Sequence, residues 1–120
     1  MKKEDLLNKK WKLGVDYLQR SFIIKEDTNT ETPVGMLSWP LGKHVNGTQR
    51  QRMNAELVAK APELYKTCIN LLYYITVCND TKTPINLQDS ELKAAHELLS
   101  ELSNRIEKIE EYTSYEDMIK

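Results

Sequence analysis

Apolar residues recur along the C-terminal part of the chain at alternating spacings of three and four. This repeat is typical of an amphipathic helix with a narrow apolar seam, and Asp89 or Ser90 stands where its N-cap is expected. We call the repeating residues the C-terminal seam: Leu92, Ala95, Leu99, Leu102, Ile106 and Ile109. The seam needs a second helix to cover it, either in the same chain, as a helical hairpin, or in a second subunit of a homo-oligomer.

The N-terminal third follows a different period. Apolar residues from Trp11 to Tyr17 alternate with polar residues and Gly14, which predicts a half-buried strand. A helical spacing from Trp11 to Phe22 also fits, and we favour the strand because Gly14 and β-favouring residues lie inside it. Two further strands and the loop between them follow: Ser21–Lys25, Glu26–Pro33 and Val34–Trp39. Together they predict a small antiparallel sheet over about residues 10–42, after a short helical turn within residues 1–12.

The middle of the chain predicts a long helix from Gln49 to about Asn79, with Thr48 as its N-cap. Pro62 interrupts this helix, because proline cannot donate a backbone hydrogen bond to the carbonyl four residues before it. The helix is therefore kinked or split near Ala61. After a turn over residues 79–83, the C-terminal helix completes a hairpin. The predicted fold is one α+β domain, residues 1–120, with its helical region over residues 49–112.

Composition agrees with a single soluble globular domain: 120 residues, 40% hydrophobic and 29% charged. The formal net charge of -1 argues against a polybasic membrane anchor and a general nucleic-acid coat. Acidic residues nevertheless concentrate in the last third of the chain, which makes double-stranded nucleic acid an unlikely partner. Because no stretch approaches the roughly 20 apolar residues of a membrane span and no signal peptide is apparent, we expect a cytoplasmic protein.

Few residues have the types and spacings that catalysis or metal binding needs. Cys68 and Cys78 have neither CxxC spacing nor histidine partners, so we expect free thiols. The two histidines, His44 and His96, stand apart from each other, and no phosphate-binding loop or known catalytic motif occurs. The sequence therefore predicts a non-enzymatic protein without a cofactor or metal.

An acid-free span from Thr32 to Ala55 is the candidate binding site. Basic residues near a helix start, together with free backbone N–H groups, are suited to an anion or phosphate, and a tryptophan can stack on a base. The candidate ligand-binding residues are Trp39, Lys43, His44, Asn46, Arg50 and Arg52. An ordinary solvated loop is the alternative interpretation of the same residues.

The segment Asn54–Leu64 reads NAELVAKAPEL. It resembles the hallmark segment, approximately NARLIAAAPELLEAL, of a widespread group of small phage and prophage proteins, although Tyr65 stands in place of the usual second leucine. The order of elements also matches that group, whereas its HTPGPW-like start is absent. The resemblance implies a phage origin, an α+β fold and action inside the infected cell. It transfers no catalytic residue, and we interpret the alanines and Pro62 as architecture.

Together these observations predict a phage accessory protein that acts by binding. The leading hypothesis is counter-defence, in which an oligomer sequesters a nucleotide-type host immune signal such as a cyclic ADP-ribose or a cyclic oligonucleotide. The alternative is an inhibitor or adaptor that docks on a host defence protein through the acidic C-terminal helix. A structural or DNA-associated phage factor is a third reading.

Overall fold

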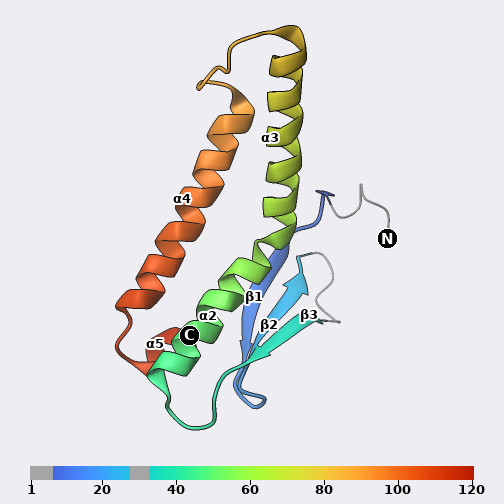
Figure 1. Ribbon diagram of the computed structural model, residues 1–120. Coiled ribbons are helices and arrows are strands. Elements are labelled where there is room, and N and C mark those ends of the chain that lie inside the picture. Colours follow the sequence, from blue (N-terminus) through green and yellow to red (C-terminus); the bar gives the residue numbers. More distant parts are fainter. Residues whose placement is uncertain (1–6, 28–32) are drawn as a thin grey trace.

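The computed structural model describes residues 7–27 and 33–120, and it confirms the α+β class (Figure 1). The predicted N-terminal helical turn falls largely on residues 1–6, outside the described residues, as does most of the loop before the third strand. The elements along the chain are β1 (Trp11–Asp16), β2 (Ser21–Glu26), β3 (Pro33–Ser38), α2 (Val45–Ala59), α3 (Ala61–Thr81), α4 (Ser90–Glu111) and α5 (Tyr115–Met118).

The three strands form an antiparallel sheet in the order β1-β2-β3. Val15 pairs with Phe22 across β1 and β2, so these two side chains share the face that packs on α2. The β1–β2 turn is held by Asp16, whose Oδ1 accepts hydrogen bonds from the backbone N–H groups of Leu18 and Gln19 at 3.0 and 3.1 Å. A short acidic side chain at this position is a common way to satisfy a tight turn.

The core lies between the sheet and α2. Phe22 and Trp39 pack with their ring centroids 4.9 Å apart, and Tyr115 of α5 contacts the Trp39 ring at 6.3 Å. Met118, also in α5, is completely buried. The sequence analysis did not predict α5, because four residues are too few to show a helical period.

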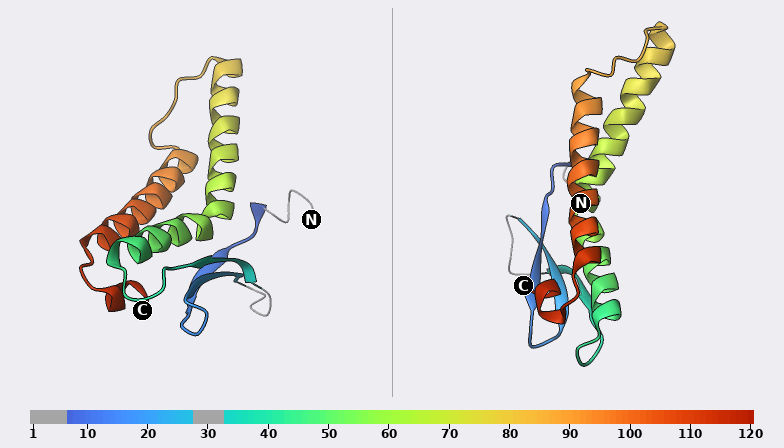
Figure 2. Two further views of the ribbon diagram at one scale, coloured as in Figure 1. Left: turned by 60° about the horizontal axis from the view of Figure 1, so that its bottom comes forward. Right: turned by 90° about the vertical axis from the view of Figure 1, so that its left-hand side faces the viewer.

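The long helix is split where Pro62 predicted a break. α2 ends at Ala59, and Pro62 lies in the first turn of α3, where a helix leaves backbone N–H groups without partners and proline is tolerated. Ala55, Ala59 and Pro62 are all buried, which supports an architectural role for the Asn54–Leu64 segment. The bend directs α3 away from the sheet, so that α3 and α4 project beyond it (Figures 1 and 2).

Two predicted helix ends were wrong. α2 begins at Val45 with His44 as its N-cap, and Thr48 is a buried residue inside the first turn rather than the cap. Gly47 permits this early start, because a Cβ there would lie 2.6 Å from Cγ of Pro40. At the other end, α3 continues through Thr81 and stops at Lys82, which adopts the left-handed conformation common after helix ends. The predicted turn therefore begins later than Asn79.

The C-terminal seam packs partly within the chain. Of the two N-caps that the sequence allowed for α4, Asp89 and Ser90, the structure has Asp89, whose side chain accepts a hydrogen bond from the N–H of Glu91. Every second member of the seam is buried, whereas Leu99 is 53% exposed. The buried members are Ala95, Leu102 and Ile109.

An ion cluster joins α2 to α4. Glu56, only 5% exposed, lies 3.2 Å from Nη2 of Arg52 and 3.4 Å from Nη1 of Arg105. Lys60, at the bend between α2 and α3, pairs with Glu101 of α4 at 3.4 Å. Because Glu56 and Arg52 are withdrawn from water, each needs the other to offset its desolvation.

The substitution Glu56→Ala should destabilise the protein strongly. It leaves Arg52 largely buried without its carboxylate, and breaking such a pair costs about 3 kcal/mol of the free energy of unfolding. Urea denaturation followed by tryptophan fluorescence measures the change. Glu107→Ala, at an exposed position of α4, is the control and should change the free energy of unfolding by less than about 0.5 kcal/mol. Equal effects of the two substitutions would contradict a structural role for the cluster.

Candidate functional site

Two residues of the predicted basic site have structural roles. Trp39 is 4% exposed, with its ring between Phe22 and Tyr115, so it is not placed to stack on a ligand base. Arg52 is also engaged inside the protein: its guanidinium lies 5.4 Å from the centre of the Phe22 ring, and Nη1 donates to the carbonyl of Met118 at 3.2 Å.

The other four residues of that site are exposed but do not converge. Lys43 pairs with Glu116 of α5 at 3.1 Å. The pKa of the Glu116 carboxyl is lowered, first by a hydrogen bond from its own backbone N–H and then by Lys43 and the Ser114 hydroxyl. None of the six predicted residues lines the five hollows found over the sheet and along α3 and α4 in the described part of the chain. The remaining three, all exposed, are His44, Asn46 and Arg50.

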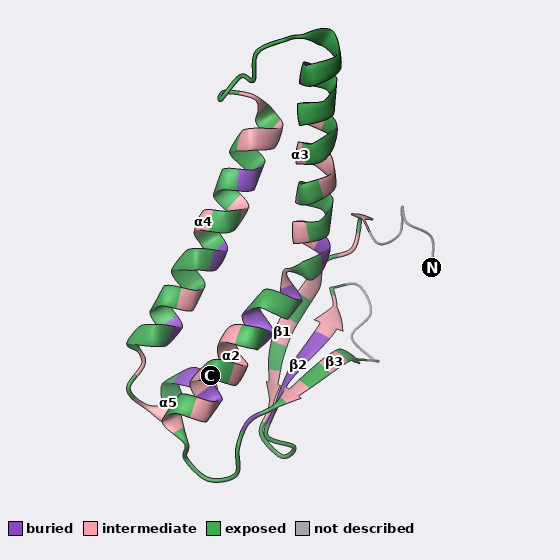
Figure 3. Ribbon diagram, viewed as in Figure 1, coloured by how far each residue is buried: buried purple, intermediate pink, exposed green. Residues whose placement is uncertain are grey.

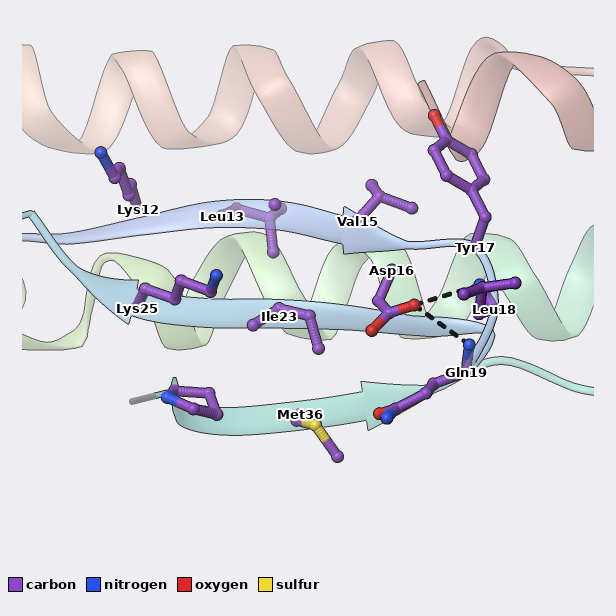
Figure 4. Close-up of a pocket in the computed structure, with 12 residues that line it drawn as sticks. Lys12, Leu13, Val15, Asp16, Tyr17, Leu18, Gln19, Ile23, Lys25 and Met36 are labelled. Carbon is purple, nitrogen blue, oxygen red and sulfur yellow. Dashed lines mark hydrogen bonds between the residues drawn. The ribbon is translucent and has the colours of Figure 1, made fainter. Parts of the chain in front are cut away.

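A hollow of about 730 Å³ lies elsewhere, on the outer face of the sheet (Figure 4). This face points away from α2, and strand alternation brings every second residue of β1 and β2 to it. Its middle row consists of Gly14, Ile23 and Met36, which pair across the three strands. The floor of the hollow is therefore apolar and flat.

Gly14 has a particular part in this floor. Its φ is not positive, and a Cβ added to it would meet only the carbonyl oxygen of Ile23, at 4.0 Å. The backbone conformation and packing of β1 would thus accept a larger residue, although glycine inside a strand weakens it. What the glycine provides is open space above the sheet, of the kind a ligand needs when it approaches a backbone closely.

Two lysines stand at one end of the hollow (Figure 4). Lys12 and Lys25 are directly opposite each other on β1 and β2. Like charges in this arrangement destabilise a sheet. Lys12 reaches Asp27 at 3.8 Å with both side chains more than half exposed, and Lys25 forms no ion pair within the described residues. An anion bound between the two ammonium groups would relieve their repulsion.

The β1–β2 turn closes the other end with Tyr17, Leu18 and Gln19. The Asp16 carboxylate there is already engaged by two backbone N–H groups. Four residues separate Lys12 from Asp16 along β1, which corresponds to about 13 Å. The hollow thus offers a positive end, an apolar middle and a rim with an aromatic ring and an amide.

The sequence contained a signal for this face of the sheet that was not used to predict the site. The alternation of β1 already separated Lys12, Gly14 and Asp16 from the apolar residues, but a polar strand face is ordinarily solvated. The informative additions are a mid-strand glycine and a lysine at the matching position of the next strand. Whether Lys25 lies opposite Lys12 depends on the register of β1 and β2, which in turn depends on the length of the turn between them.

Other chemistry is not assembled in residues 7–27 and 33–120. Within them, no group of three or more His, Cys, Asp or Glu side chains is arranged to hold a metal ion. Cys78 is buried and Cys68 is exposed, and both are free thiols. No helix in the described part of the chain has the length and apolar character needed to cross a membrane.

Comparisons of the chain with protein-family models, with curated proteins and with solved structures found no match.

Gly14→Ala should stabilise the unliganded protein. Replacing a glycine by alanine where the backbone accepts it adds about 0.5 kcal/mol to the free energy of unfolding. Urea denaturation gives the measurement, with Gly47→Ala as the control, because its Cβ would clash with Pro40 and should destabilise. A loss of stability in Gly14→Ala would show that the fold itself requires the glycine.

Proposed function

We propose that this chain is a non-enzymatic binding protein that captures an anionic ligand with a flat apolar body on the outer face of its sheet. The observation that carries the proposal is the cross-strand pair Lys12 and Lys25 at the edge of an apolar hollow. A repulsive pair at this position weakens the sheet, and the Asp27 carboxylate lies near only one of the two lysines, Lys12. The apolar row beside the lysines supplies a surface for the rest of the ligand.

A nucleotide-type compound has both parts. Lysine ammonium groups act as point charges that bind phosphate, and the flat floor beside them accommodates a base. The proposal keeps the class of ligand inferred from the sequence and moves its site from the Trp39–Arg52 region to the sheet.

The setting of this function is also a proposal. The likeness of Asn54–Leu64 to a segment of phage and prophage proteins supports action in an infected cell. There the captured ligand would be a nucleotide-type signal of host immunity, such as a cyclic ADP-ribose or a cyclic oligonucleotide. By holding the signal, the protein would lower its free concentration.

A thermal-shift screen against linear nucleotides, ADP-ribose, cyclic ADP-ribose isomers and cyclic dinucleotides tests the proposal. A ligand at a hundred times its Kd adds about 2.7 kcal/mol to the stability of the native state, which raises Tm by several degrees. The double substitution Lys12→Gln with Lys25→Gln should weaken binding by about tenfold or more. Because it also removes a repulsion, Tm of the unliganded protein should not fall.

The matched control is Lys43→Gln with Arg50→Gln, which removes two exposed positive charges from the originally predicted site. Binding should persist in this variant. Loss of binding in the control alone would return the site to the acid-free span. Unchanged melting curves across the whole panel would overturn ligand capture.

The alternative, docking on a host protein through α4, is favoured by the exposed acidic side chains of that helix. Glu107 and Glu110 point to solvent, whereas Glu101 is held by Lys60 and Arg105. Charge reversal to Glu107→Lys with Glu110→Lys should abolish capture of a host protein from lysate and leave ligand binding unchanged. Pull-down with mass spectrometry checks it, and capture that survives the reversal would contradict docking through α4.

A further inference from the structure

The middle of α3 is uncharged yet exposed. No acidic or basic residue occurs from Thr67 to Asn79. A helix without charge around its circumference is normally buried on all sides. Here Leu72 is 67% exposed and Tyr73 is 72% exposed, and Figure 3 shows exposed residues along most of the projecting part of α3.

α3 carries two apolar lines, offset by one residue. The first line is buried or half-buried on a helix that packs against α4: Leu64, Thr67, Leu71, Tyr74 and Cys78. The second follows the same spacing of three and four and is exposed: Tyr65, Cys68, Leu72 and Ile75. A helix with two such lines is suited to contact two neighbours, of which the chain supplies one.

α4 adds to the same exposed surface. Leu99 is exposed and Leu92 half-buried, and they lie about 40–80° around the helix from the buried Ala95 and Leu102. On α3 the exposed line is rotated from the buried line in the same sense, by about 100°. Because α3 and α4 run antiparallel, rotation in the same sense brings both exposed lines to one side of the hairpin. We call this side the bare face.

The rest of the protein lies on the opposite side of the hairpin. Glu101 of α4 contacts Lys60, the residue that follows α2, and Arg105 of α4 contacts Glu56 within α2. α2 is the helix that covers the sheet. Glu101 lies about 160° around α4 from Leu99. Figure 2 shows the sheet on one side of the helices, which leaves the other side unobstructed.

We propose that the bare face binds the bare face of a second copy of this chain, so that two hairpins form an antiparallel four-helix bundle. The α3 part of this face carries no charge from Thr67 to Asn79, so it meets itself without like-charge repulsion and offers a charged partner nothing to pair with. An identical hairpin also has the same length and spacing of apolar residues. This inference does not depend on the ligand proposed for the sheet.

The size of the face is sufficient for such a dimer. Residues 61–79 of α3 extend for about 27 Å, and two packed helices are about 20 Å wide. Two such faces together bury on the order of 1,100 Å², which exceeds the about 1,000 Å² that a specific interface needs. The area is at the low end, so we expect a dimer that dissociates at micromolar concentrations.

Sedimentation velocity and equilibrium over about 1–200 µM test the proposal. The protein should shift from monomer to dimer within this range. Leu72→Glu places a charge in the bare face and should weaken dimerisation by about 100-fold or more. Tyr73→Glu is the matched control, because Tyr73 is equally exposed but lies about 100° around α3, and it should dimerise as the unsubstituted chain does.

Leu99→Glu on α4 should reproduce the effect of Leu72→Glu. Both side chains are more than half exposed, so neither substitution should lower the Tm of the monomer. A protein that stays monomeric up to 200 µM would overturn the proposal, and so would a dimer that survives both substitutions. Ligand binding to the sheet, measured on Leu72→Glu, should be unchanged, which separates failure of this proposal from failure of the proposed function.

Discussion

Arg52 is the residue on which the arrangement of the other elements depends. Its guanidinium covers the Phe22 ring of the sheet, pairs with Glu56 on its own helix and donates to the carbonyl of Met118 in α5. Glu56 in turn reaches Arg105 of α4. A charge taken out of water has to be matched where it lies, because an unpaired one costs several kcal/mol. One ion cluster therefore positions the sheet, α4 and α5 relative to α2.

This central position of α2 explains which surfaces remain uncovered. One side of α2 receives the inner face of the sheet, and another receives α4 (Figure 1). The outer face of the sheet and the bare face of the hairpin are left over, and they point in opposite directions. A dimer formed through the hairpins would therefore keep the outer face of the sheet accessible in both subunits. In the proposals made above, the assembly would hold two ligand sites per dimer without either site crossing the interface.

Local chemistry was enough to predict the strands, the break at Pro62 and the cap at Asp89, because each depends on residues within a few positions. The proposed binding site was not predictable in this way. The acid-free span ends at Ala55. The residue after Ala55, Glu56, supplies the carboxylate that pairs with Arg52. Arg52 and Glu56 are four residues apart, the spacing of an ion pair on a helix. The burial of the Arg52–Glu56 pair depends on α4 and α5, which are distant in sequence.

The sequence left open whether the C-terminal seam packs within or between chains, and the repeat of the seam supplies one line of residues for the contact within the chain and one for the proposed contact between chains. Its two lines recur every seven residues and lie on adjacent sides of α4. The line through Ala95, Leu102 and Ile109 is buried within the chain, whereas the line through Leu92 and Leu99 borders the bare face. α2 and α3 both pack against α4, yet they leave Leu99 exposed. The same argument applies to α3, so both helices lack a neighbour on one side, and a second hairpin is the smallest unit that supplies both.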